Sequence, residues 1–161
     1  MTDSAGRSNL VQLLLVEDNP DDEHLTLETL KEYRLTNRIH VAHDGAEALD
    51  FLFARGAYDG VFQTGLKVVL LDIKLPKVDG LEVLRQLRAN PLTSHLPVVL
   101  LTSSAEEKDL VKAYALKANS YVVKPVDFGQ FSDAVTEIGL YWAVLNRLPA
   151  SKDPLSTLPV H

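Results

Sequence analysis

Short apolar runs alternate with amphipathic stretches five times along this chain of 161 residues. Strand-sized runs separated by helix-sized stretches predict a (βα)5 fold, an α/β architecture with a doubly wound parallel sheet. We expect the strand order 2-1-3-4-5, in which strands one and three are neighbours. The predicted strands are residues 10–16, 39–42, 67–72, 98–101 and 121–123.

Polar residues that suit helix starts come after these strands. Asn19 can cap a helix because its side chain accepts hydrogen bonds from free backbone N–H groups, and Pro20 suits the first helical position. The other predicted caps are Asp44, Asp79, Ser104 and Asp127. A loop with three glycines, residues 56–66, precedes the third strand. The side chains expected to face the core from the first and third helices are Leu27, Leu30, Tyr33, Leu81, Leu84 and Leu87.

Four of the five strands end on polar groups. The first is followed by Glu17 and Asp18, the third ends on Asp72, the fourth is followed by Thr102 and the fifth by Lys124. Because open α/β sheets bind ligands at the carboxyl ends of their strands, these groups are expected to meet at one edge. A single acid after a strand is more often a solvated loop residue, but three acids in register with a hydroxyl and a lysine favour a site. Oxygen ligands of this kind suit Mg²⁺.

Composition narrows the possible functions. The net charge of −6 argues against nucleic-acid binding, which calls for a basic face, and the lack of cysteine excludes thiol chemistry. No apolar stretch approaches the ~20 residues of a membrane span, and residues 1–9 do not resemble a signal peptide, so we expect a cytoplasmic protein. Glycine motifs for dinucleotides or nucleoside triphosphates are absent, and the histidines have no metal-ligand spacing.

Four segments carry a resemblance to a known family: 14–19 (LLVEDN), 70–80 (LLDIKLPKVDG), 98–103 (VVLLTS) and 121–125 (YVVKP). In this order they resemble the receiver domain of two-component response regulators, the CheY-like superfamily with a flavodoxin-like fold. The resemblance runs from about Leu10 to about Ile138. Segments 48–56 (ALDFLFARG) and 140–142 (LYW) are similar to small single-domain regulators that partner bacterial phytochromes.

The resemblance implies a function for each matching position. Asp72 would be the phosphoacceptor, and Asp18 and Asp72 would bind Mg²⁺ directly. Glu17 would act through water, and the backbone carbonyl of Lys74 would complete the protein ligands. Thr102, Lys124 and Tyr121 would be the catalytic and switch residues, although Tyr121 is also explained by ordinary packing on an edge strand.

The resemblance also implies how such a chain would act. It would take a phosphoryl group from a sensor histidine kinase, for which a bacterial phytochrome is the suggested example, and would not be an enzyme for outside substrates. One alternative is a phosphate-independent interaction module with the same fold. Another is a Mg²⁺-dependent phosphatase that acts on outside substrates, although phosphatases of the haloacid-dehalogenase type usually carry a second aspartate where Lys74 stands. The isomer of the Lys124–Pro125 bond stays open.

The predicted domain spans residues 10–148 between disordered segments 1–9 and 149–161, and the roughly twenty residues after the receiver match are expected to be too few for an output domain. The last helix of the domain, from Asp127 to Leu148, would extend ~30 Å and overhang the sheet. Apolar side chains at its end predict a homodimer through the fourth helix, the fifth strand and the fifth helix. The predicted dimer residues are Tyr141, Trp142 and Leu145.

Overall fold

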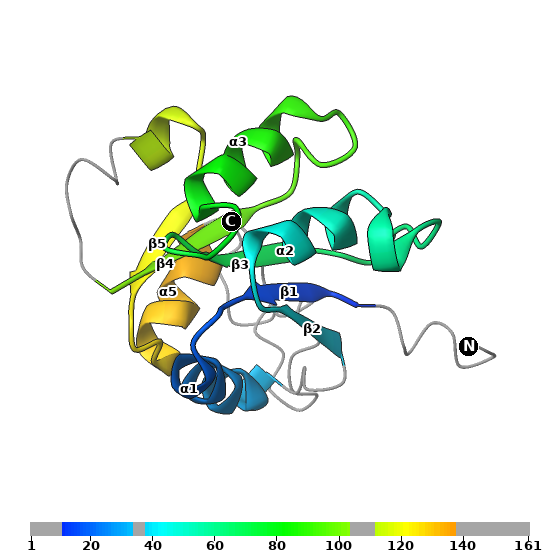
Figure 1. Ribbon diagram of the computed structural model, residues 1–161. Coiled ribbons are helices and arrows are strands. Elements are labelled where there is room, and N and C mark those ends of the chain that lie inside the picture. Colours follow the sequence, from blue (N-terminus) through cyan, green and yellow to red (C-terminus); the bar gives the residue numbers. More distant parts are fainter. Residues whose placement is uncertain (1–10, 34–37, 104–111, 138–161) are drawn as a thin grey trace, which may run out of the picture.

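Parallel strands form one sheet in the order β2-β1-β3-β4-β5 (Figure 1). The computed structural model describes residues 11–33, 38–103 and 112–137. The predicted fold class and strand order are confirmed. The strands are β1 (Leu13–Val16), β2 (Ile39–Ala42), β3 (Val68–Asp72), β4 (Val98–Thr102) and β5 (Ser120–Val123).

Helices cover both faces of the sheet, with α1 and α5 on one side and α2 and α3 on the other (Figure 1). Residues 112–115 are also helical, and two 3₁₀ turns, η2 (Lys31–Tyr33) and η4 (Gly56–Tyr58), come after α1 and α2. None of the described helices is long and apolar enough to cross a membrane. The helices are α1 (Pro20–Leu30), α2 (Gly45–Leu52), α3 (Gly80–Ala89) and α5 (Phe128–Glu137).

Apart from Asp72 and Thr102 at their carboxyl ends, the central strands β1, β3 and β4 are apolar, because each face packs against helices. In β1, Leu13 and Leu15 belong to the core beneath α1 and α5, whereas Leu14 and Val16 belong to the core beneath α2 and α3. The edge strand β2 is less buried, and only Ala42 is fully covered. The side chains of the central strands are therefore committed to packing, which leaves the strand ends for chemistry.

The predicted caps within the described residues are observed. Asn19 Oδ1 accepts hydrogen bonds from the backbone N–H groups of Asp21 and Asp22, both at 2.9 Å. Asp44, Asp79 and Asp127 each accept from a backbone N–H in the first turn of α2, α3 and α5. These caps fix the residue at which each helix begins after the preceding strand.

Two details of the core differ from the prediction. On α3, Val83 is fully buried together with Leu84 and Leu87, whereas Leu81 is only partly buried at the start of the helix. On α1, the core receives Thr26 as well as Leu30, and Leu27 is partly buried. Both differences arise because the face that a helix buries depends on its rotation about its own axis against the sheet. The positions of the leucines in the sequence do not define that rotation.

Some predictions fall outside the described residues. They include the disordered segments 1–9 and 149–161, the cap at Ser104 and the end of the last helix. The proposed dimer residues Tyr141, Trp142 and Leu145 also lie there.

Candidate functional site

The register of the sheet brings the predicted site residues to one edge. Val16 of β1 lies opposite Leu71 of β3, so the next residues along each strand, Glu17 and Asp72, leave the sheet at the same level. Thr102 lies opposite Val123, which places Lys124 next in line at the same edge. The strand ends therefore converge, as expected for an open α/β sheet.

The Lys124 ammonium group forms hydrogen bonds with three of the acids at this edge. Its Nζ lies 2.8 Å from Asp72 Oδ2, 3.1 and 3.3 Å from the two Glu17 oxygens, and 2.9 Å from Asp22 Oδ2. The Lys124 side chain is only 10% exposed, and those of Glu17 and Asp72 are 0% and 4% exposed. Lys124 is therefore a buried counter-ion rather than a solvated surface charge.

Sequence reasoning missed Asp22 as a partner of Lys124. The side chain of Asp22 is 31% exposed and reaches the site from the first turn of α1. Asn19 brings it there, because its side chain caps that turn while its backbone N–H donates to Glu17 Oε2 at 3.2 Å. The predicted cap at Asn19 indicated that the first turn of α1 lies at this edge, but which acid of that turn faces Lys124 depends on the rotation of the helix, which the local sequence does not define.

The electrostatics of the site depend on burial and crowding. Burial raises the pKa of Glu17 to about 7, and the hydrogen bond and negative charge of Asp72 act in the same direction against the attraction of Lys124. Burial by itself lowers the pKa of Lys124, but hydrogen bonds with Asp72 and Asp22 outweigh it and hold that pKa above its ordinary value. Lys124 is therefore charged, and the surplus of carboxylates favours a further cation.

The acids have the composition of a magnesium site. Glu17, Asp18 and Asp72 each offer an oxygen atom, and these atoms lie within 4.8 Å of one another. Asp18 is exposed, so the cluster can be reached from solvent, while the other two acids are buried. All-oxygen ligand sets with open positions for water suit Mg²⁺. The residues present therefore fit this ion.

The remaining predicted residues surround this cluster. The backbone N–H of Lys74 donates to Asp72 Oδ1 at 3.3 Å, which fixes the turn after β3. Thr102 is buried at the end of β4, and Tyr121 on β5 is 36% exposed, three residues before Lys124. The Lys124–Pro125 bond, whose isomer the sequence left open, is cis.

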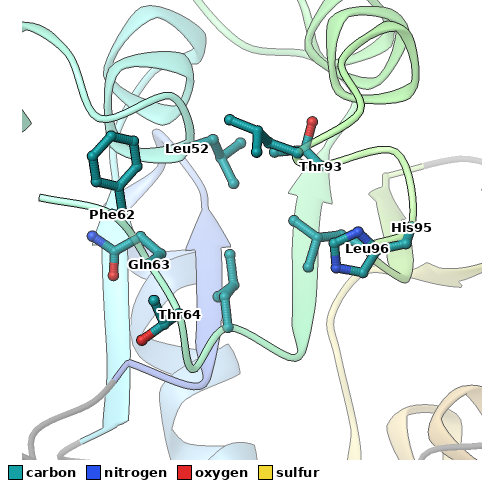
Figure 2. A pocket seen from close by; sticks show the side chains of 9 residues that line it. Leu52, Phe62, Gln63, Thr64, Thr93, His95 and Leu96 are labelled. Carbon is teal, nitrogen blue, oxygen red and sulfur yellow. The ribbon is translucent and has the colours of Figure 1, made fainter.

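A separate hollow of about 360 Å³ lies near the amino ends of β3 and β4 (Figure 2). It is lined by segments that precede β3 and β4 and by the end of α2, so it is remote from the strand ends that carry Asp72. The predicted site residues that the structure describes do not line it. Its lining includes Leu52, Phe62, Gln63, Thr93, His95 and Leu96.

Comparison with known proteins identifies the family to which this chain belongs. Residues 13–136 match the response regulator receiver domain, and the chain belongs to that family. It is 40% identical over 137 residues to the probable methanogenesis regulatory protein FilR2 of Methanothrix harundinacea, covering 85% of this chain and 86% of the relative. It is 36% identical over 139 residues to the response regulator Rcp1 of Synechocystis sp., covering 86% and 93%.

Solved structures that resemble the chain include regulators associated with phytochromes. The bacteriophytochrome response regulator RtBRR is 50% identical with a TM-score of 0.76, covering 88% of this chain and 85% of that one. The bacteriophytochrome response regulator AtBRR is 52% identical with a TM-score of 0.73, covering 86% and 99%. The Mn²⁺-bound form of Rcp1 is 35% identical with a TM-score of 0.67, covering 82% and 94%.

Proposed function

We propose that the protein is a single-domain response regulator that accepts a phosphoryl group on Asp72 in a Mg²⁺-dependent reaction. The observation that carries this proposal is the buried Asp72 carboxylate, held 2.8 Å from the Lys124 ammonium group beside two further acids. A carboxylate in that position is both oriented for attack and flanked by positive charge. The chain itself would be a signalling protein rather than an enzyme for outside substrates.

The transfer would be a displacement at phosphorus. An Asp72 carboxylate oxygen forms the new P–O bond while the P–N bond of a phosphohistidine breaks, and the imidazole leaves with the bonding pair. Lys124 offsets the charge of the phosphoryl oxygens. Mg²⁺, when held by Asp18, Asp72 and the Lys74 carbonyl, with Glu17 acting through water, would supply further positive charge. The Mn²⁺-bound form of Rcp1 supports a divalent ion in such a domain.

The phosphoryl group would be sensed by Thr102 and reported by Tyr121. Thr102 ends the strand beside Lys124, and Tyr121 lies on β5, which leads directly into Lys124, with part of its side chain in solvent. The partner that delivers the phosphoryl group would be a sensor histidine kinase in the cytoplasm. The similarity to RtBRR and AtBRR supports a bacterial phytochrome as that kinase.

The output surface would be a homodimer interface formed by the fourth helix, β5 and α5. Tyr114, Tyr121 and Phe128 are exposed large side chains in this region. The predicted contacts of Tyr141, Trp142 and Leu145 would extend it within a domain of residues 10–148, with 1–9 and 149–161 disordered. Sedimentation of the wild type and of a Trp142→Ala, Leu145→Ala double variant tests this, because only the wild type should dimerise at tens of micromolar.

Phosphorylation is tested without any kinase. The protein is incubated with acetyl phosphate and Mg²⁺, and an acid-stable, base-labile adduct is sought on a phosphate-affinity gel. We expect the adduct in wild type, its absence in Asp72→Asn, and its loss when EDTA removes the metal. Absence of the adduct in wild type would favour the phosphate-independent interaction module instead, and rapid hydrolysis of many phosphoesters would favour a phosphatase.

A further inference from the structure

The segment 123–126, which carries Lys124, is hydrogen-bonded to three neighbouring elements. Within the sheet, the Lys124 backbone N–H donates to the Thr102 carbonyl at 2.7 Å. From α1, the Thr29 hydroxyl donates to the Val126 carbonyl at 2.9 Å. From α5, the Gln130 side chain reaches back and bonds to the turn through both of its amide atoms. The contacts from β4 and α1 are single hydrogen bonds, whereas the Gln130 side chain forms several.

Gln130 pairs with β5 as a neighbouring strand would. Its Oε1 accepts from the Val123 N–H at 3.1 Å, and its Nε2 donates to the Val123 carbonyl at 3.0 Å. Nε2 also lies 3.3 Å from the Pro125 carbonyl and 3.2 Å from Asp127 Oδ2. Because β5 is the last strand of the sheet in the part of the chain that the structure describes, its outward backbone groups have no strand partner there, and the amide supplies one.

This arrangement differs from what a helix start requires. In a capping box, the glutamine at the third helical position returns to the backbone N–H of the capping residue. Here Asp127 caps α5 by accepting from the Gln130 N–H at 2.8 Å, but the Gln130 amide extends past the cap to the strand. The side chain therefore links the first turn of α5 to Val123, the residue immediately before Lys124.

We propose that Gln130 is a positioning residue that sets the place of the Lys124 ammonium group and couples α5 to the phosphorylation site. Lys124 Nζ lies within 3.3 Å of oxygens on three acids, so a small displacement of its backbone breaks several contacts at once. Gln130 also lines an open hollow of about 300 Å³ beside Tyr121 and Asp133. A partner that contacts Gln130 in this hollow would act through it on the backbone that leads into Lys124.

The test compares Gln130→Met and Gln130→Glu with Gln86→Met in the full chain. Methionine keeps the length of the side chain but removes all four of its hydrogen bonds, and glutamate keeps the acceptor but places a carboxylate oxygen against the Val123 carbonyl. Gln86 is the matched control because it is a helical glutamine on α3 whose amide bonds to Glu82, away from the site.

The first measurement is ¹⁵N NMR of lysine-labelled protein without Mg²⁺ or phosphodonor. The buried Lys124 ammonium group should give a slowly exchanging signal, assigned by its loss in Lys124→Met. We expect both Gln130 variants to shift or lose this signal and Gln86→Met to retain it, with all three remaining folded by circular dichroism. Retention of the wild-type signal in both Gln130 variants would overturn the proposal, whether or not the protein accepts phosphate.

The second measurement rests on the proposed function. It monitors the adduct on Asp72 with acetyl phosphate over a range of Mg²⁺ concentrations. Because misplacing a reacting group by about 1 Å can cost up to 10²-fold in rate, we expect the maximal rate of both Gln130 variants to fall by about 10-fold. The Mg²⁺ concentration for half-maximal rate should change less than the maximal rate, since the substitutions alter none of the acids that would bind the ion. Rates equal to that of Gln86→Met would overturn the coupling, whereas an unlabelled wild type would refute the proposed function and leave the NMR result to decide.

Discussion

Replacement of Arg88 by methionine should destabilise the domain far more than its place on the surface of α3 suggests. The guanidinium group donates to carbonyl oxygens from two separate loops: Leu96 at 2.7 Å, Ser94 at 3.1 Å and Lys117 at 2.9 and 3.2 Å. A further bond of 3.0 Å runs to Asn119 Oδ1. Burial lowers the pKa of Arg88, because removal from water disfavours the charged form of the guanidinium group.

The magnitude of this effect depends on which acceptors water can reach once the guanidinium group is gone. Hydrogen bonds to a charged group contribute about 1.5–3 kcal/mol each, but the contacts with Ser94 and Lys117 are exposed, and water would recover most of their value. The Leu96 carbonyl is part-buried and would lose its short bond. Asn119 would lose its orientation, although its Oδ1 also accepts from the Val98 N–H at 2.8 Å at the start of β4. We therefore expect a loss of about 2–4 kcal/mol.

Urea unfolding monitored by circular dichroism measures this loss, with Arg85→Met as the control. Arg85 lies one turn earlier on the same helix, and its pair with Glu82 at 2.6 Å joins side chains that are 55% and 39% exposed. An exposed pair of this kind contributes little to stability, because water screens its charges. If Arg88→Met lost no more stability than Arg85→Met, the view that Arg88 fastens the two loops to α3 would be wrong.

Three further residues give predictions of their own. Burial lowers the pKa of His40, which stacks on Phe51 at 4.3 Å, so the native state binds fewer protons than the unfolded chain between that pKa and 6.5. Stability should therefore fall as the pH drops through this window, and urea titrations at several pH values should show a smaller fall in His40→Asn. Gly80→Ala should destabilise by about 2 kcal/mol or more in the same assay, because an added methyl group would lie 2.1 Å from the Asp72 carbonyl; an unchanged midpoint would refute this. Mg²⁺ should raise the melting temperature of the wild type but raise it less in Asp18→Asn, and equal shifts would exclude Asp18 as a ligand.

Sequence patterns predicted the sheet well because a strand that is buried on both faces must be apolar along its whole length. This constraint made the central strands β1, β3 and β4 recognisable, and the polar residues that follow each apolar run marked the carboxyl ends. Helix rotation was harder to predict. Val83 was missed on α3, and Asp22 was missed at the site, because a helical residue can face the sheet, its edge or solvent depending on a rotation that local sequence does not define.

The site also shows why a strand pattern alone could not account for Lys124. Strand register places Val123 opposite Thr102 and Lys124 next in line, but the Lys124 ammonium group is held by contacts with Asp22 of α1 and with Glu17 and Asp72 at the strand ends. A phosphoryl group on Asp72 would add oxygen acceptors within reach of an ammonium group that already contacts three acids and has three protons to donate. One contact must then weaken, and Asp22 is the acid most able to release Lys124, because its side chain is 31% exposed while that of Glu17 is fully buried. The first turn of α1 would thus respond to the state of Asp72 together with the Lys124 turn.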